Sequence, residues 1–178
     1  MTEPFKYLST IDISEILQVF KTKITENDWL EDTSRSETFD VHKDTHMLKI
    51  LWDINFIGER HERNYSLFNF DKVIKNLTDV YKLHYKEGEV IRALFVRLKE
   101  HSQIPEHVDS GDSLETCHRT HIPIITNEEN LFKVGPEVKN LKAGEVWVID
   151  NTMTHAVRNM SGEPRIHLIV DYMEKDYD

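Results

Sequence analysis

Two stretches of the chain carry apolar residues at helical spacing. In residues 12–24 they recur every three or four positions, which places them on one face of a helix. Asp12 and Glu15 stand three apart at the start, the spacing of a capping box. Residues 71–85 repeat the apolar pattern, and Gly88 ends that region. We therefore expect two helices, and the amphipathic helix at 12–24 is expected to cover a sheet.

The remaining apolar residues fall into short runs that are typical of strands. Turn-forming residues separate these runs, and the short spacing favours an all-β barrel or sandwich over a parallel sheet. Residues 25–46 are polar and charged, and we expect a long loop or irregular first strands there. The predicted strands are 47–56, 90–99, 122–125, 131–134, 146–149, 155–159 and 165–172.

The length and composition narrow the class of protein. A chain of 178 residues most simply forms one domain that buries its own core. Its single cysteine, Cys117, forms no intrachain disulfide, which fits a reducing compartment. The net charge of −10 disfavours nucleic-acid binding, which needs a basic footprint. With no signal-peptide pattern and no apolar run of membrane-spanning length, we expect a soluble cytoplasmic protein without a membrane partner.

Three residues in the second half of the chain suggest a metal site. His107 and Asp109 are two residues apart, so on an extended segment both side chains point to the same side. His155 follows an apolar run and a short polar link, and begins another run of strand character. Two imidazoles and one carboxylate on one face of a metal form the facial triad of non-haem Fe(II) oxygenases. We therefore predict that His107, Asp109 and His155 bind iron.

An arginine ten residues after the second histidine suggests an anion clamp. Segments 155–159 and 165–172 flank turn-forming residues around Gly162, and we predict that they form an antiparallel hairpin. In that register the side chains of His155 and Arg165 lie on the same face of the hairpin, about 13 Å apart along the strands. A metal-bound dicarboxylate and a long side chain would span this distance, and arginine pairs bidentately with carboxylate.

The motifs together resemble those of a known family. The Fe(II)/2-oxoglutarate-dependent oxygenases share a pattern that this chain resembles: His-x-Asp, then a second His, then Arg. Over residues 90–173 the chain more narrowly resembles the aspartyl/asparaginyl β-hydroxylase-like family, which includes bacterial hydroxylases of free amino acids such as proline. The segments that carry this resemblance are Arg-Thr-His-Ile-Pro-Ile (119–124), Gly-Glu-Val-Trp-Val-Ile-Asp (144–150) and His-Ala-Val-Arg-Asn (155–159).

The resemblance implies a fold, cofactors and residue roles. It implies a mainly β double-stranded β-helix, the cupin-like jelly roll, with flanking N-terminal helices. Residues 1–89 would supply helical support and the first strands, and 90–173 the catalytic core. Fe(II) would be held by the triad, and Arg165 would bind the far carboxylate of 2-oxoglutarate. Arg119 and His121 match positions that help to hold this co-substrate.

The reaction that this resemblance implies is hydroxylation of an unactivated carbon, with O₂ consumed and succinate and CO₂ released. The family's founding members have Gly in place of the acidic ligand, and its halogenases lack a carboxylate there. Asp109 therefore favours hydroxylation over halogenation. The expected substrate is a free amino acid or an Asp, Asn or Pro residue in a peptide. The oligomeric state is not predicted.

Two alternatives remain open at this stage. One is a cupin-like metal enzyme without 2-oxoglutarate, in which His121 joins the two histidines as a third nitrogen ligand. The other is a non-catalytic jelly-roll binding module. Two further expectations concern the surroundings: residues 111–117 form a polar loop that is a candidate lid, and one of Arg92 and Arg97 faces inward because strand residues alternate between faces.

Overall fold

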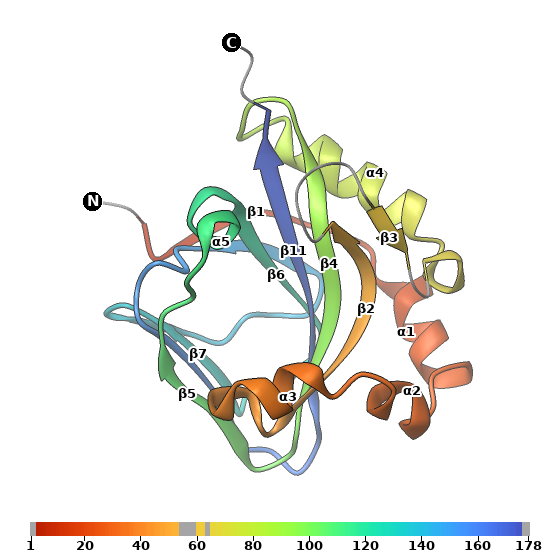
Figure 1. The fold of residues 1–178 in the computed structure, drawn as a ribbon, viewed down its shortest axis with the longest axis vertical. Coiled ribbons are helices and arrows are strands. Elements are labelled where there is room, and N and C mark those ends of the chain that lie inside the picture. The colour runs from red at the N-terminus through yellow and green to blue at the C-terminus, as the bar shows by residue number, and fades with distance from the viewer. Residues whose placement is uncertain (1–2, 54–59, 63–64, 176–178) are drawn as a thin grey trace.

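Two antiparallel sheets form the body of the protein, as the computed structural model shows for residues 3–53, 60–62 and 65–175 (Figure 1). The larger sheet has the order β1-β9-β6-β11-β4-β2-β3 and the smaller β5-β10-β7-β8. The strands of the larger sheet are β1 (Phe5–Thr10), β2 (Thr45–Asp53), β3 (Arg60–Glu62), β4 (Gly88–Leu98), β6 (His118–Ile125), β9 (Glu145–Ile149) and β11 (Arg165–Glu174). Those of the smaller sheet are β5 (Ser102–His107), β7 (Asn130–Val134), β8 (Glu137–Lys139) and β10 (His155–Asn159).

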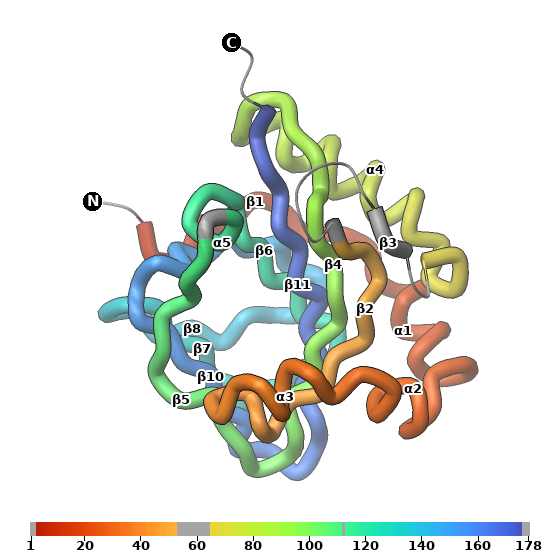
Figure 2. The backbone as a smooth tube through the Cα atoms, viewed as in Figure 1, coloured from red at the N-terminus to blue at the C-terminus, as the bar shows by residue number. Residues whose placement is uncertain are grey.

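From β4 onward the chain passes back and forth between the sheets. β4, β6, β9 and β11 belong to the larger sheet, whereas β5, the β7–β8 pair and β10 belong to the smaller. Figure 2 shows β5, β10 and β7 facing β4 and β11 across the interior. This alternation is the topology of a double-stranded β-helix. The predicted mainly β jelly-roll fold is confirmed.

The larger sheet is buried on both faces because each face is covered. Its outer face packs against helices α1 (Ser14–Thr22) and α4 (Phe70–Tyr81), which lie side by side with it in Figure 1. Its inner face packs against the smaller sheet, where Leu98 of β4 meets Phe132 of β7. Because successive side chains of a strand point to opposite faces, each strand contributes residues to two separate cores. The predicted role of the first helix, covering a sheet, is confirmed.

The predicted helices are slightly longer than the observed ones. α1 begins at Ser14, whose backbone N–H donates to the Asp12 carboxylate at 2.9 Å, and the expected capping box with Glu15 does not form. α4 ends at Tyr81, and Leu83 beyond it is 81 % exposed. No helix in the described part of the chain is long and apolar enough to cross a membrane.

Residues 25–46 are more ordered than the sequence suggested. They form α2 (Glu26–Leu30), α3 (Ser34–Thr38) and a 3₁₀ turn, η1 (Asp40–His42), so the prediction of a long loop or irregular strands is wrong. A second 3₁₀ turn, η2 (Ser66–Phe68), precedes α4. Each of α2 and α3 is only five residues long, too short for a hydrophobic period to be visible. The expected loop at 111–117 likewise contains a short helix, α5 (Asp112–Thr116).

The predicted hairpin between β10 and β11 is also wrong. β10 pairs with β5 on one edge and β7 on the other, whereas β11 lies between β4 and β6 in the facing sheet. A strand has two hydrogen-bonding edges, and both edges of β10 are occupied. The turn instead crosses between the sheets, where the Asn159 side chain donates to the carbonyls of Lys99 (2.9 Å) and Glu163 (2.8 Å).

The start of β4 requires a residue without a side chain. A Cβ at Gly88 would lie 2.2 Å from the carbonyl oxygen of Met173 on the neighbouring β11. We expect Gly88→Ala to lower the free energy of unfolding by about 1–3 kcal/mol through overpacking. Gly162→Ala is the control, because its Cβ would meet nothing closer than His101 Nε2 at 3.8 Å. Urea denaturation of both variants is the measurement, and equal stability would contradict the expectation.

Candidate metal centre and anion pocket

The two predicted histidine ligands are cross-strand neighbours. His107 ends β5 and His155 begins β10, and the two residues are paired in the antiparallel register with ring centroids 4.2 Å apart. Asp109 follows two residues after β5, and its backbone N–H donates to the carbonyl of Asn151 at 3.4 Å. One ligand atom from each of these three side chains lies within 4.8 Å of the others. The structure thus brings the predicted triad together in a geometry that fits a metal ion.

Backbone carbonyls fix the orientation of both histidine rings. Nδ1 of His107 lies 2.8 Å from the carbonyl oxygen of Pro105, and Nδ1 of His155 lies 2.9 Å from that of Met153. A carbonyl only accepts, so Nδ1 carries the proton and donates in each ring. Nε2 of each ring then keeps its lone pair, as a metal ligand requires. Burial lowers the pKa of His155, which favours the neutral, metal-binding form.

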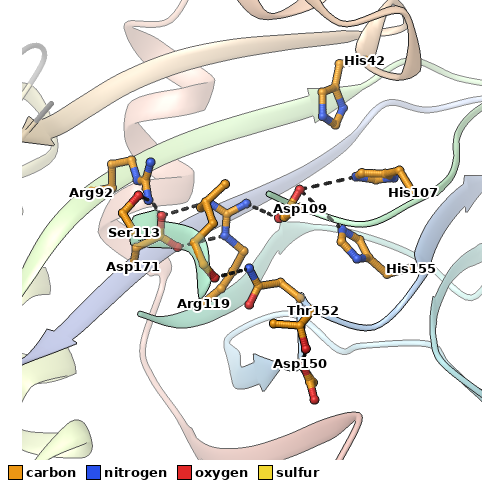
Figure 3. Close-up of polar contacts among 12 residues, drawn as sticks. His42, Arg92, His107, Asp109, Ser113, Arg119, Asp150, Thr152, His155 and Asp171 are labelled. Carbon is orange, nitrogen blue, oxygen red and sulfur yellow. Dashed lines mark hydrogen bonds and ion pairs between the residues drawn. The ribbon is translucent and has the colours of Figure 1, made fainter. Parts of the chain in front are cut away.

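The Asp109 carboxylate faces the histidines with one oxygen and an arginine with the other. Oδ1 lies 3.7 Å from His107 Nε2 and 3.8 Å from His155 Nε2. Oδ2 accepts a hydrogen bond from Arg119 Nη1 at 2.6 Å. Figure 3 shows Asp109 between Arg119 on one side and the two imidazoles on the other. Burial opposes the charge of Asp109, but Arg119 and the histidines hold its pKa below the usual value. It is therefore an anionic ligand at neutral pH.

Arg119 is itself held by a second carboxylate. Its Nε and Nη2 donate to the two oxygens of Asp171, each at 2.9 Å, and Arg92 Nε donates to the same carboxylate at 2.6 Å. Burial works against the Arg119 charge, but Asp171 and Asp109 raise its pKa further above the ordinary value. Burial likewise opposes ionisation of Asp171, yet Arg119 and Arg92 lower its pKa. The chain Arg92–Asp171–Arg119–Asp109 therefore fixes the candidate acidic ligand.

A second group of buried polar residues surrounds Arg165. Arg165 and His167 lie on the inner face of β11, and Arg165 Nη2 donates to His167 Nδ1 at 2.8 Å. His121 on neighbouring β6 places its ring 5.8 Å from that of His167. Phe132 joins this group to the metal centre, because its ring centroid lies 4.9 Å from that of His121 and 6.5 Å from that of His155.

Arg165, His167, His121 and Phe132 together form a candidate anion site, the Arg165 pocket. Some of its polar atoms lack partners. Among the described residues, His121 Nδ1 and His167 Nε2 are buried without a hydrogen-bond partner. His167 Nδ1 accepts from Arg165, so its Nε2 carries a proton that nothing in that part of the chain accepts. Burial lowers the pKa of Arg165 to about 9. Unsatisfied donors and an unbalanced guanidinium are expected where an anionic ligand binds.

The structure distinguishes between the two arginines of β4. Arg92 points inward to Asp171 and lies 3.2 Å from the Ser113 hydroxyl. Arg97 points outward, where its guanidinium donates to both carboxylate oxygens of Glu26 on α2. Arg92 is therefore the inward-facing residue that strand alternation required.

Several residues around the site were not identified from the sequence. Asp171 and His167 share the inner face of β11 with Arg165, so the period-two pattern of 165–171 contained the signal that could have found them. Arg35 and His42 come from the α3–η1 region, where no strand or helix pattern was visible. The predicted co-substrate roles of Arg119 and His121 stay predictions, and the contacts of Arg119 are with Asp109 and Asp171.

Fold and site define a double-stranded β-helix protein with a candidate His–Asp–His metal centre. The sequence model of the aspartyl/asparaginyl β-hydroxylase family matches residues 13–175, so the chain belongs to that family. The resemblance inferred from the motifs is confirmed.

Individual relatives are more distant. The chain is 27 % identical to an L-proline cis-4-hydroxylase of Rhizobium meliloti (strain 1021) over 101 residues, which are 57 % of this chain and 36 % of that protein. The match thus spans about a third of the relative's length.

Solved structures support the fold. A 2OG-Fe(II) oxygenase family oxidoreductase from Burkholderia pseudomallei is 21 % identical with a TM-score of 0.58, covering 74 % of this chain and 69 % of that one. A prolyl hydroxylase from Trichoplax adhaerens, in complex with a peptide fragment of the hypoxia inducible factor oxygen degradation domain, is 11 % identical with a TM-score of 0.63. That similarity covers 97 % of this chain and 84 % of the other.

Proposed function

We propose that this protein is an Fe(II)- and 2-oxoglutarate-dependent dioxygenase that hydroxylates an unactivated carbon of an amino acid or of an amino-acid residue in a peptide. The observation that carries the proposal is the pairing of two sites inside one jelly roll. One is the His107–Asp109–His155 centre, and the other is the buried Arg165 pocket. Membership of the aspartyl/asparaginyl β-hydroxylase family supports the same reaction class.

The residues present fit an iron(II) ion. His107 and His155 would bind through Nε2, because both Nδ1 atoms are engaged with backbone carbonyls. Asp109 would bind through Oδ1, because Oδ2 is engaged with Arg119. Two nitrogens and one oxygen form the facial ligand set that leaves coordination positions open. Arg119 acts here as a positioning residue, since it holds the carboxylate that would touch the metal.

The Arg165 pocket fits the far carboxylate of 2-oxoglutarate. Arg165 would bind it through its planar guanidinium, and the unpartnered His167 Nε2–H would donate a further hydrogen bond. The unpartnered His121 Nδ1 lies in the same pocket, which supports its predicted role in holding the co-substrate. The ring of Phe132, with the Arg165 guanidinium 5.6 Å from its centroid, forms an apolar wall of this pocket.

Iron with O₂ and 2-oxoglutarate supplies the oxidising chemistry, in which the co-substrate yields succinate and CO₂ and the substrate gains a hydroxyl. The chain's own residues bind and orient the reactants. Arg119 holds and orients the Asp109 carboxylate, and the backbone carbonyls of Pro105 and Met153 hold the two imidazoles so that each Nε2 stays available as a ligand. Burial of Arg165 and His121 removes competing water from the co-substrate carboxylate.

The choice between a small-molecule and a peptide substrate rests on the relatives and on the sequence. The relative in Rhizobium meliloti acts on L-proline, and the Trichoplax adhaerens structure contains a peptide, so both a small molecule and a peptide are consistent with the family. We favour a small molecule, because the sequence shows no recognition repeat. The single-domain organisation and the cytoplasmic location stay predictions, the latter based on a single cysteine.

The cupin-like alternative is less well supported. It requires His121 as a third nitrogen ligand, but the metal-ligand cluster found among the described residues consists of His107, Asp109 and His155. The ring of His121 contacts those of Phe132 and His167 instead. In the alternative Arg165 would be structural, which leaves unexplained a buried charge that no carboxylate of the described residues pairs with.

Anaerobic titration tests the proposal. We expect the Fe(II)-loaded protein to develop the weak visible charge-transfer band of an iron chelate when 2-oxoglutarate is added. Arg165→Ala removes the proposed clamp, and we expect its apparent affinity for 2-oxoglutarate to fall about 10- to 100-fold, the range for a lost charge-assisted pair. Arg158→Ala, an exposed arginine on β10, is the control and should titrate like the parent.

The outcomes of this titration are distinct. Bound iron without a band would favour the cupin-like enzyme, and no bound metal would favour a non-catalytic binding module. A band of equal strength and affinity in the parent and Arg165→Ala would remove the assignment of Arg165.

A further inference from the structure

A cavity of about 420 Å³ opens beside the metal centre, on a side that does not include the Arg165 pocket. It lies between helix α3, strands β2 and β4 and the segment after β5, and it reaches the metal ligands His107 and Asp109. Its volume falls within the usual range for small-molecule sites, about 300–1,000 Å³. Under the proposed function, it is where the substrate would meet the metal.

Four cationic side chains line this cavity: Arg35, Lys49, Arg92 and Arg119. Three of them are matched by carboxylates. Lys49 pairs with Asp32 at 2.8 Å. Arg92 pairs with Asp171, and Arg119 pairs with both Asp171 and Asp109. The fourth, Arg35 of α3, has no carboxylate partner within the part of the chain that the structure describes.

Arg35 is held in place by a neutral group. Its Nη2 donates to His42 Nε2 at 3.1 Å, and its Nε is buried without a partner among the described residues. Because His42 Nε2 accepts this hydrogen bond, it carries no proton, and the ring is neutral. Burial and the nearby Arg119 lower the pKa of Arg35 to about 10, which still leaves it protonated. The cavity thus contains one positive charge that nothing in the described chain balances.

We propose that Arg35 binds a carboxylate of the substrate and that the cavity selects small acids that lack a free ammonium group, such as N-acylated amino acids. The four cations face three carboxylates, Asp32, Asp109 and Asp171, which leaves a net charge of +1. Arg165, the proposed partner of 2-oxoglutarate, is not part of this cavity. One monoanion therefore neutralises the charged groups that line the cavity.

An ammonium group finds no free carboxylate among the described residues that line the cavity. Among its described lining residues Asp109 is the carboxylate present, and it is assigned to the metal and to Arg119. A free amino acid would place its ammonium near Arg35 and Lys49, where like charges repel. An acyl group instead suits the apolar wall, because Trp52 and Met47 line the cavity and the half-exposed Phe39 and Val108 lie at its rim.

The position of Arg35 explains how it would direct the reaction. His42, which holds Arg35, has its ring 5.2 Å from that of His107. A carboxylate bound to Arg35 is therefore anchored one side chain away from a metal ligand. Anchoring of one end of a substrate fixes which carbon lies at the open coordination position. This inference rests on the proposed function and adds a substrate class and a specificity-determining residue to it.

Matched pairs of ligands test whether the cavity prefers acids that lack an ammonium group. Calorimetric titration under anaerobic conditions would compare each common amino acid with its N-acetyl derivative, on protein loaded with Fe(II) and 2-oxoglutarate. We expect at least one N-acetyl derivative to bind at least about tenfold more tightly than its parent zwitterion. Tighter binding of the zwitterions, equal binding within every pair, or no binding of any N-acetyl derivative would overturn the proposal.

Variants test the residue. We expect Arg35→Gln to weaken binding of the best N-acetyl derivative about 10- to 100-fold, Arg35→Lys to restore part of it, and exposed Arg158→Gln to leave it unchanged. Unchanged affinity in Arg35→Gln would overturn the assignment. The proposed function fails separately, because its failure would appear as a missing chelate band before any substrate is added.

Discussion

Replacement of Asp109 by alanine is expected to abolish hydroxylation. The variant loses the oxygen that faces both histidine Nε2 atoms, so two nitrogens remain to hold iron. It also leaves Arg119 with one of its two carboxylate partners, which places a buried positive charge next to the metal site. Loss of an outer partner of a metal ligand typically costs about 10- to 100-fold in affinity or activity, and loss of the ligand itself should exceed about 100-fold. Succinate formation coupled to product, together with bound iron per chain, is the measurement.

A neighbouring carboxylate provides the control for this variant. Glu106 precedes His107 on β5, but its side chain faces solvent and pairs with Lys133. We expect Glu106→Ala to keep the parent rate and iron content. An undiminished rate in Asp109→Ala would remove Asp109 from the metal site and the triad from the proposed function.

Asp171→Asn is expected to cause the largest loss of stability. Asp171 is fully buried and accepts hydrogen bonds from both Arg92 and Arg119. Asparagine keeps the shape but removes the charge, which leaves two buried or partly buried guanidinium groups with less compensation. Breaking a buried ion pair by removing one partner typically costs about 3–5 kcal/mol. The free energy of unfolding, measured by urea denaturation at neutral pH, should fall by an amount in this range.

The pH dependence gives this prediction a second signature. Arg119 and Arg92 lower the pKa of Asp171 in the folded protein, so its ionised form contributes stability above the unfolded pKa of about 3.9. That contribution is lost as the pH falls through the lower folded pKa. The stability difference between the parent and Asp171→Asn should therefore be largest at neutral pH and narrow below about pH 4.

An exposed ion pair provides the comparison. Asp79 pairs with Lys75 one turn away on α4, and both side chains are largely exposed. Such surface pairs contribute about 0.3–0.5 kcal/mol, so Asp79→Asn should have a small effect. If Asp171→Asn changed stability no more than Asp79→Asn, the buried network would not be a source of stability.

His107 and Asp109 could be predicted as candidate ligands because the signal that joins them is local. The His-x-Asp spacing puts His107 and Asp109 on one side of an extended segment, and the structure places them within reach of one metal ion. The helical periods of residues 12–24 and 71–85 were equally local, and both helices formed with ends shifted by a few residues. Arg165 was singled out by its spacing from His155 in a predicted hairpin that does not form, although the structure buries it on the inner face of β11.

The partner of each strand was not predictable in the same way. The turn around Gly162 suggested that β10 pairs with β11, but β10 instead pairs with β5 and β7. A turn sequence indicates that the chain reverses, and it does not indicate which edge of a distant strand is free. The true pairing sets His155 beside His107, so the same residues reached the metal site through a different register.

What the sequence determined by itself is that short strands build the fold, and it singled out the candidate groups of the site, the His–Asp–His set and Arg165. The tertiary structure alone decided which charges meet. It set Arg119 between Asp109 and Asp171, and it brought Arg35 from a polar segment to the mouth of the metal centre. The physical reason is that periodicity and turn chemistry act over a few residues, whereas the balance of buried charges depends on packing between segments far apart in the chain.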